Sequence, residues 1–189
     1  MVLQRSHLVR LLVAITLVAL AAVGLRLSED EDNVEIVRGV LGEPLTVNGG
    51  TVTASQVKVG TALVRYDQVS ARTPGLFVAV RVQAAATGTE AVPVFDARVY
   101  SGNRRYDSFG FRKPGGAAPG LQESLDVVFE VDPATLDDLT LELDPVELLS
   151  GYSQNVRIHL GITPANADRW RAAGRDQVIE VAERTLRGT

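Results

Sequence analysis

The sequence predicts a mainly β protein, in which an antiparallel β-sandwich follows a single N-terminal transmembrane helix. Two observations predict the sandwich: short runs in which apolar and polar residues alternate, and clusters of Gly, Asn and Pro between these runs. A third observation, one long apolar stretch near the N-terminus, predicts the membrane helix. The chain has 189 residues and no cysteine. Disulfides, thiolate metal sites and cysteine nucleophiles are therefore excluded.

The apolar stretch spans residues 8–27, and residues 1–10 hold the charges that precede it. Residues 11–25 carry no charge, whereas Arg5 and Arg10 lie before them. A transmembrane helix needs about 20 apolar residues. The positive charges on the N-terminal side should keep residues 1–10 in the cytoplasm.

A cleaved signal peptide is the alternative interpretation of the same segment. Ala19-Leu20-Ala21 fits the small residues of a cleavage site. We favour the uncleaved anchor, because apolar residues continue past that site to Leu27. An anchor predicts a single-pass protein of the cell membrane with an extracytoplasmic C-terminal domain, and cleavage predicts a secreted protein.

The acidic residues are concentrated beyond the apolar segment. All 23 acidic residues lie after residue 27, together with 16 of the 19 basic residues, so this part of the chain has a net charge of −7. A negative domain argues against nucleic acid as a partner. Residues 28–42, which include the run Glu29 to Asp32, predict an acidic linker between membrane and domain. The run lacks the glycine and the final glutamate of a calcium-binding loop.

The predicted β-sandwich occupies residues 43–187, and its first half alternates most clearly. Asn48-Gly49-Gly50 is a turn between two strands within residues 45–59. In residues 76–84 every second residue from Leu76 is apolar, which is the mark of a strand with one buried face. Residues 87–90 form the next turn. The other strands expected in this half are residues 63–66, 93–101 and 104–106.

The second half repeats the pattern and ends with a short helix. The strands expected here are residues 121–131, 139–143 and 156–162. A helix is expected near residues 166–173, with Asn166 as its N-cap and Gly174 as its C-terminal stop. Residues 177–186 fit a last strand or a second helix, and their β-branched start favours a strand.

The order of these features resembles a known family. The Thr87–Glu90 turn follows a core strand, and Pro119-Gly120 precedes VVFEVDPA, residues Val127–Ala134, in which a strand is followed by a proline. The order resembles the telokin-like, immunoglobulin-fold extracytoplasmic domains of unknown function in bacterial membrane-anchored proteins. The resemblance covers residues 42–144, and it departs at Ala85-Ala86, where such domains often have asparagine. It implies an immunoglobulin-like fold outside the cytoplasm and carries over no catalytic residues.

The sequence offers little for catalysis or for cofactor binding. His7 precedes the apolar segment, which leaves His159 as the one histidine of the predicted domain. We expect His159 on the outward face of a strand, beside Arg157, as a solvated or locally hydrogen-bonded side chain and not as a base or a ligand. A zinc site would need further histidine or cysteine. The sequence therefore predicts no enzyme, no cofactor and no metal site.

Residues 102–120 form the candidate partner-binding loop. The loop carries four basic residues and one acid, a local charge of +3, in a domain of opposite charge. Basic and aromatic side chains together favour contact with an acidic partner or an envelope polymer. In the alternative, the two phenylalanines close one end of the sandwich while the cations stay in water. The candidate contact residues are Arg104, Arg105, Tyr106, Phe109, Phe111, Arg112 and Lys113.

These observations predict a non-catalytic, membrane-anchored extracytoplasmic interaction or structural module of the bacterial cell envelope. Such a module would be an accessory to a neighbouring membrane or transport complex. The alternative is a domain that binds or senses a small ligand. That alternative needs a concave pocket lined by converging polar residues, and no such set is visible in the sequence.

Overall fold

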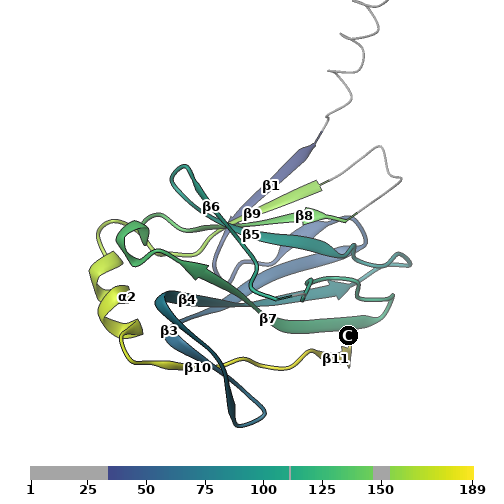
Figure 1. The fold of residues 1–189 in the computed structure, drawn as a ribbon. Helices are drawn as coiled ribbons and strands as arrows, with labels where there is room; N and C mark the ends of the chain where they lie inside the picture. Colours follow the sequence, from purple (N-terminus) through teal and green to yellow (C-terminus); the bar gives the residue numbers. More distant parts are fainter. Residues whose placement is uncertain (1–33, 111, 147–153) are drawn as a thin grey trace, which may run out of the picture. The chain divides into compact units, whose positions relative to one another are not determined.

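The structure is a computed structural model that describes residues 34–110, 112–146 and 154–189. Within these residues the chain is mainly β, and two sheets form a sandwich (Figure 1). The predicted cytoplasmic segment 1–10, the anchor 8–27 and residues 28–33 of the linker lie outside the described residues. In the part of the chain that is described, no helix has the length and apolar character needed to cross a membrane.

The first sheet, called the five-stranded sheet below, carries the candidate site. Its strands come from both ends and the middle of the domain. Their order across the sheet is β1 (Glu35–Val40), β9 (Gln154–His159), β8 (Thr140–Pro145), β5 (Phe95–Ser101) and β6 (Arg104–Asp107).

The second sheet, called the six-stranded sheet, contains the two longest strands. These are β3 and β4, which form a hairpin through Tyr66 and Asp67, both with positive φ. The order is β10 (Val178–Glu180), β3 (Gly50–Arg65), β4 (Gln68–Ala86), β7 (Leu121–Val131) and β11 (Thr185–Gly188), with β2 (Leu45–Val47) paired to β3. The strand predicted over residues 63–66 is the end of β3.

Two strand pairs are parallel, so the prediction of a purely antiparallel sandwich is wrong for them. β1 pairs with β9 and β10 pairs with β3, both in parallel. Each pair joins segments far apart in the sequence. Alternation identifies a strand and its buried face, but it carries no information about the direction of its neighbour.

The linker predicted over residues 28–42 is wrong at its C-terminal end. Residues 35–40 form β1, which pairs along its whole length with β9. The acidic run before this segment favoured a linker, so the predicted linker extends too far toward the C-terminus. Ile36, Val37 and Val40 are nevertheless typical strand residues. The domain therefore begins at least as early as Glu35.

The alternating runs place their core-facing apolar residues between the two sheets, as predicted. The expectation that the strand over residues 76–84 has a single buried face is wrong, because Phe77 and Ala79 on its other face are also buried. Leu76, Val78, Val80 and Val82 of β4 are almost fully buried in the main core. Leu141 and Leu143 of the opposite sheet are also buried there. Each fully buried side chain of this kind contributes about 1.5–3 kcal/mol.

A second, smaller apolar cluster lies on the outer face of the six-stranded sheet. Its members, all buried, are Leu63, Phe77, Ala79, Val128, Ile179 and Val181. The C-terminal segment builds it by crossing from β10 at one edge of the sheet to β11 at the other (Figure 1). Residues 177–186 thus contain β10 and the start of β11, which confirms the prediction of strand.

Helix α2 (Ala167–Gly174) confirms the predicted helix, but two details of its ends are different. Asn166 is the N-cap residue, yet its side chain makes no cap hydrogen bond. It accepts from the Thr163 N–H and donates to the Gly161 carbonyl, so it fixes the preceding loop. Gly174 is part of the helix, and a Cβ there would lie 2.5 Å from Leu76 Cδ1. A side chain at this position would therefore require Leu76 to move.

Candidate functional site

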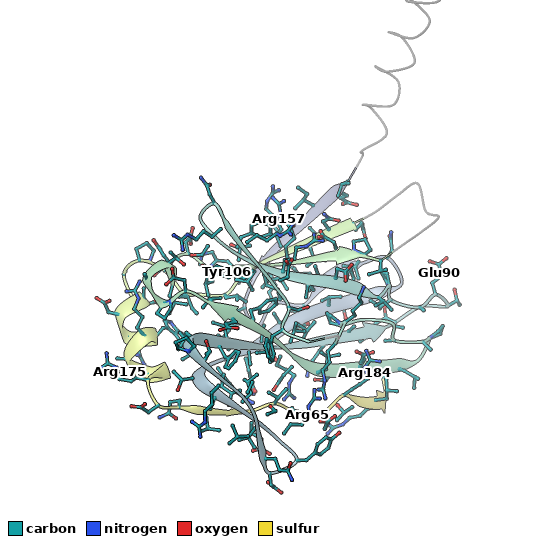
Figure 2. The ribbon with its side chains drawn as sticks, viewed as in Figure 1. Arg65, Glu90, Tyr106, Arg157, Arg175 and Arg184 are labelled. Atoms are coloured by element: carbon teal, nitrogen blue, oxygen red, sulfur yellow. The ribbon has the colours of Figure 1, made fainter. Side chains whose placement is uncertain are left out.

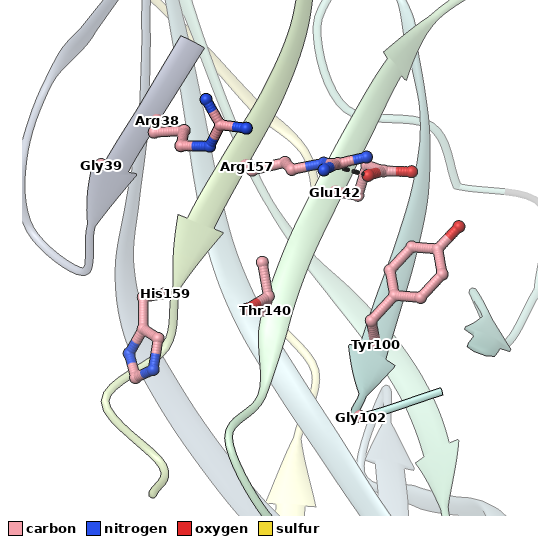
Figure 3. Close-up of a pocket in the computed structure, with 8 residues that line it drawn as sticks. All are labelled: Arg38, Gly39, Tyr100, Gly102, Thr140, Glu142, Arg157 and His159. Atoms are coloured by element: carbon pink, nitrogen blue, oxygen red, sulfur yellow. Dashed lines mark hydrogen bonds and ion pairs between the residues drawn. The ribbon is translucent and has the colours of Figure 1, made fainter. Parts of the chain in front are cut away.

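A hollow of about 510 Å³ lies on the outer face of the five-stranded sheet. Figure 3 shows the side chains that surround it. Its volume is in the range of small-molecule sites, roughly 300–1,000 Å³. The residues that line it are Arg38, Gly39, Tyr100, Gly102, Thr140, Glu142, Arg157 and His159.

The pleat of four neighbouring strands brings these side chains together. β1, β9, β8 and β5 lie in that order, and alternate residues of each strand point outward. The intervening residues, such as Val99, Leu141 and Ile158, are fully buried in the core. Packing of the core face therefore fixes the register of the outer face.

Charged residues form one row across the sheet at one end of the hollow. Arg38 pairs in register with Arg157, Arg157 with Glu142, and Glu142 with Arg98. Arg98 continues the row to Asp107 of β6. Neighbours in the row alternate in sign, except at Arg38 and Arg157, where two cations are adjacent (Figure 3).

Glu142 is the acidic centre of this row. Its carboxylate is 6% exposed and accepts a hydrogen bond from Arg157 Nε at 2.5 Å. Tyr100 lies on the other side of Glu142 (Figure 3). Partial burial, and then the negative charge of Glu142, raise the pKa of the Tyr100 phenol. A tyrosine is a neutral phenol at physiological pH even with its ordinary pKa, and this shift acts in the same direction.

His159 is held by hydrogen bonds on both ring nitrogens. Its Nδ1 accepts from the Gly161 N–H at 3.1 Å, and its Nε2 lies 2.6 Å from Asp138 Oδ1. An accepting Nδ1 places the proton on Nε2, which donates to the carboxylate. While these bonds persist, His159 has no free nitrogen to act as a base or a ligand.

The chemistry that the hollow can perform is binding by charge and hydrogen bonds. No cluster of three or more potential metal ligands occurs within residues 34–110, 112–146 and 154–189. The side chains offer two guanidinium groups, a hydroxyl and a phenol beside a carboxylate that Arg157 already engages. This set suits an anionic group better than a metal ion.

The candidate loop 102–120 lies mostly apart from the hollow. Its first part is the β5–β6 turn and β6, where Arg104 forms an ion pair with Asp132 at 2.8 Å and Arg105 with Asp107 at 3.4 Å. Tyr106 is half-buried, and its hydroxyl lies 2.6 Å from Thr135 Oγ1. Gly102 alone of this loop lines the hollow.

The second part of the loop packs near the six-stranded sheet. Phe109 is 47% exposed and contacts Phe77 edge-to-face, with ring centroids 5.3 Å apart. Arg112 pairs with Glu183 at 2.9 Å and Lys113 with Asp96 at 2.6 Å. Phe111 lies outside the described residues. Each of the four cations thus has an acidic partner, and the structure does not gather them into one free patch.

The sequence alone did not identify most of the residues around the hollow as members of one site. Arg157, Tyr100, Glu142 and Thr140 occupy outward positions in the predicted strands, and Arg38 was assigned to the linker. The signal available in the sequence was that these residues alternate with core-facing residues and therefore point outward. The order of the strands across the sheet was missing, and without it these positions cannot be placed together.

A scan of known protein families and a search of curated proteins found no match to this chain. Solved structures with a similar fold include the yjhA protein from Bacillus subtilis, at TM-score 0.50 and 12% identity over 65% of this chain and 99% of that one. An uncharacterized β-sandwich protein from Clostridium difficile 630 gives a TM-score of 0.44 and 9% identity over 67% and 96% of the two chains. The first likeness agrees with the sandwich fold and concerns the fold alone.

Proposed function

We propose that this chain is a non-catalytic recognition module of the bacterial cell envelope that binds its target in the hollow of the five-stranded sheet. One observation carries the proposal: converging polar side chains from four neighbouring strands surround a cavity of about 510 Å³. Such a set is the requirement for a ligand-binding domain. In this proposal residues 8–27 anchor the module to the cell membrane, and the β-sandwich lies outside the cytoplasm.

The absence of catalysis in this proposal rests on the chemistry of the site. His159 makes hydrogen bonds through both of its nitrogens. The Glu142 carboxylate is committed to Arg157. In this proposal both groups serve to hold the site together through these bonds, and neither acts as a general base.

We also propose a more specific fold than a two-sheet sandwich. The two-sheet sandwich, together with the turn at residues 87–90 and strand β7 followed by Pro133, supports an immunoglobulin-like domain of the telokin-like family. The proposal has no consequence for catalysis, because that family contributes no catalytic residues to this chain.

Contact with a protein or polymer partner through loop 102–120 is the second candidate function. Phe109 favours it, because this large apolar side chain is 47% exposed. The ion pairs of the neighbouring Arg112 and Lys113 weaken it, since both cations already have partners. In this case the module would serve a neighbouring membrane or transport complex.

Site-specific photo-crosslinking in intact cells tests these alternatives. The photoreactive p-benzoylphenylalanine replaces Tyr100 in the hollow, Phe109 in the loop or Glu90 in an exposed turn. Recognition in the hollow predicts a discrete adduct from position 100 and none from position 90. An adduct from position 109 alone would transfer the function to the loop. Adducts from neither position would contradict a recognition role.

The lack of cysteine allows a clean test of location. A single cysteine is introduced at Glu90 or, in a second variant, at Ser6. A membrane-impermeant maleimide applied to intact cells should label the first variant and leave the second unlabelled until the cells are lysed. The reverse pattern would show that the β-sandwich lies in the cytoplasm.

A further inference from the structure

The row of charges that borders the hollow ends in an excess of positive charge. Arg157 has its carboxylate partner, Glu142, on the side away from Arg38. Arg38 itself is exposed, and among the described residues it takes part in no ion pair or side-chain hydrogen bond. Two guanidinium groups therefore share one carboxylate, a local charge of +1 on a domain that is negative as a whole.

Like charges in direct register across two strands destabilise the pair of strands. β1 is also at the edge of the sheet, so among residues 34–110, 112–146 and 154–189 no further strand brings a carboxylate to Arg38. An anion between the two guanidinium groups would restore the alternation of sign that the rest of the row shows. Arg157 donates to Glu142 through Nε, and its Nη groups remain for such an anion.

The next row across the hollow has a different character. It contains His159, Thr140 and Tyr100 in register, and it presents a hydroxyl and a phenol ring. The phenol carries no charge at physiological pH, as is usual for tyrosine. The hollow is thus cationic at one end and neutral but polar at the other, and its volume is larger than a bare oxyanion requires.

We propose that the hollow binds an anionic sugar unit, with its carboxylate or phosphate between Arg38 and Arg157 and its hydroxylated ring beside Thr140 and Tyr100. The proposal rests on the recognition function argued above and names its ligand. Guanidinium forks match the planar or tetrahedral oxygens of such a group. The ring of the sugar would take hydrogen bonds from the hydroxyl groups and cover the face of the phenol.

Calorimetric titration of the full-length chain in detergent tests the ligand class directly. The probes are glucose, glucuronate, glucose 6-phosphate and inorganic phosphate, which separate the ring from the oxyanion. We expect glucuronate or glucose 6-phosphate to bind more tightly than glucose and inorganic phosphate. Binding should weaken as ionic strength rises, since the hollow is partly exposed. Equal affinity for glucose and glucuronate would overturn the proposal.

Arg38→Gln is the informative variant, because it removes the unpaired cation and leaves the Arg157–Glu142 pair in place. Its affinity for the anionic sugar should fall roughly tenfold or more, as for the loss of a charge-assisted hydrogen bond. Arg72→Gln is the matched control: Arg72 is equally exposed and has no ion pair among the described residues, but it lies on the six-stranded sheet. Equal loss in both variants would mean that only net charge matters, and it would reject the site.

Thr140→Tyr tests the place of binding without a change of charge. A tyrosine suits a strand, and its side chain would occupy the hollow next to Tyr100. Binding of the anionic sugar should be abolished, whereas the far-ultraviolet circular dichroism spectrum should match that of the wild type. Unaltered binding in a folded variant would place the ligand elsewhere and refute the proposal.

The results also separate this inference from the proposed function. If position 100 forms a crosslink but the chain shows no preference for an anionic sugar, the result supports a recognition module and rejects the proposed ligand class. If the chain prefers an anionic sugar but forms no crosslink in cells, the result supports the binding site and rejects its recognition role in the cell. A free sugar and a unit of an envelope polymer are distinguished by titration with a glucuronate-containing oligosaccharide: a polymer source predicts higher affinity for the oligosaccharide than for the monosaccharide.

Discussion

The outer faces of the two sheets differ: one is buried and contributes to stability, and the other is the face on which we propose recognition. Both faces consist of alternate residues of twisted strands. On the six-stranded sheet this face carries Phe77, Ala79 and Val128, and the C-terminal segment covers them. On the five-stranded sheet it carries Arg38, Arg157 and other polar residues around an open hollow. Figure 2 shows Arg157 on one side of the sandwich, and Arg65 and Arg184 on the other.

Buried charge follows the same division. Asp126 lies under the C-terminal segment, 2% exposed, and bonds to Arg81, to Lys58 and to the Ala182 N–H. Glu142, on the other sheet, has one basic partner and a hollow beside it. Alternation alone therefore does not show which outward face is exposed. The C-terminal segment converts one face into core, whereas no described segment covers the hollow on the other.

Phe77→Ala should have the largest effect on stability. Phe77 is 1% exposed on the covered face, so the substitution removes core packing and should lower the free energy of unfolding by about 3–5 kcal/mol. Urea unfolding followed by Trp170 fluorescence measures it. Val40→Ala, at a 56% exposed position on the outer face of the five-stranded sheet, should change it by less than about 0.5 kcal/mol. Similar losses in the two variants would remove the distinction between the faces.

Asp126→Asn should have the next largest effect. Burial alone would raise the pKa of Asp126, but hydrogen bonds from Arg81 and Ala182 and the charges of Lys58 and Arg81 outweigh it and hold the pKa below its usual value. The variant should lose roughly 1–3 kcal/mol at pH 7. This stabilisation is present above the unfolded pKa, near about 3.9, and is lost as pH falls through the lower folded value. The difference between wild type and variant should therefore shrink below pH 4, and a constant difference would contradict the assignment.

Asp144→Asn on the five-stranded sheet should show the opposite pH dependence. Burial, and then the charge of Glu142, raise the pKa of Asp144 against the effect of Arg98. Its contribution to stability is fully present below the unfolded pKa and is lost as pH rises through the raised folded value. The variant should therefore gain relative to the wild type between pH 3 and pH 7, with a net change within about 1 kcal/mol at pH 7. Urea midpoints across this range measure it, and a relative loss with rising pH would refute the direction.

Arg38→Gln should have the smallest effect on stability. Arg38 is exposed, and the structure gives it no ion pair among the described residues, so the free energy of unfolding should change by less than about 0.5 kcal/mol. A small gain is the favoured direction, because the substitution removes the like charge opposite Arg157. The urea midpoint, measured beside that of Arg72→Gln, checks this. A loss of more than about 1 kcal/mol would show that Arg38 supports the fold.

Local patterns of apolar and β-branched residues predicted several parts of the fold correctly. The alternation in residues 76–84 gave the buried face of β4, and the β-branched start of residues 177–186 gave strand in place of helix. The acidic run at residues 29–32 led to a wrong prediction, because its charge suggested a linker that extended across β1. The prediction that Gly174 stops the helix was also wrong, because Gly174 is the last helical residue and packs closely against Leu76.

Local patterns in the sequence predicted most of the strands and their core-facing sides, together with a negative domain and no cysteine chemistry, but they missed β1 and the second buried face of β4. The tertiary structure decided which strands are neighbours. Backbone hydrogen bonds join any two strands with equal chemistry, so a strand does not specify its partner through its own pattern. The hollow exists only because β1, from the start of the domain, lies beside β9, near its end, and places Arg38 opposite Arg157.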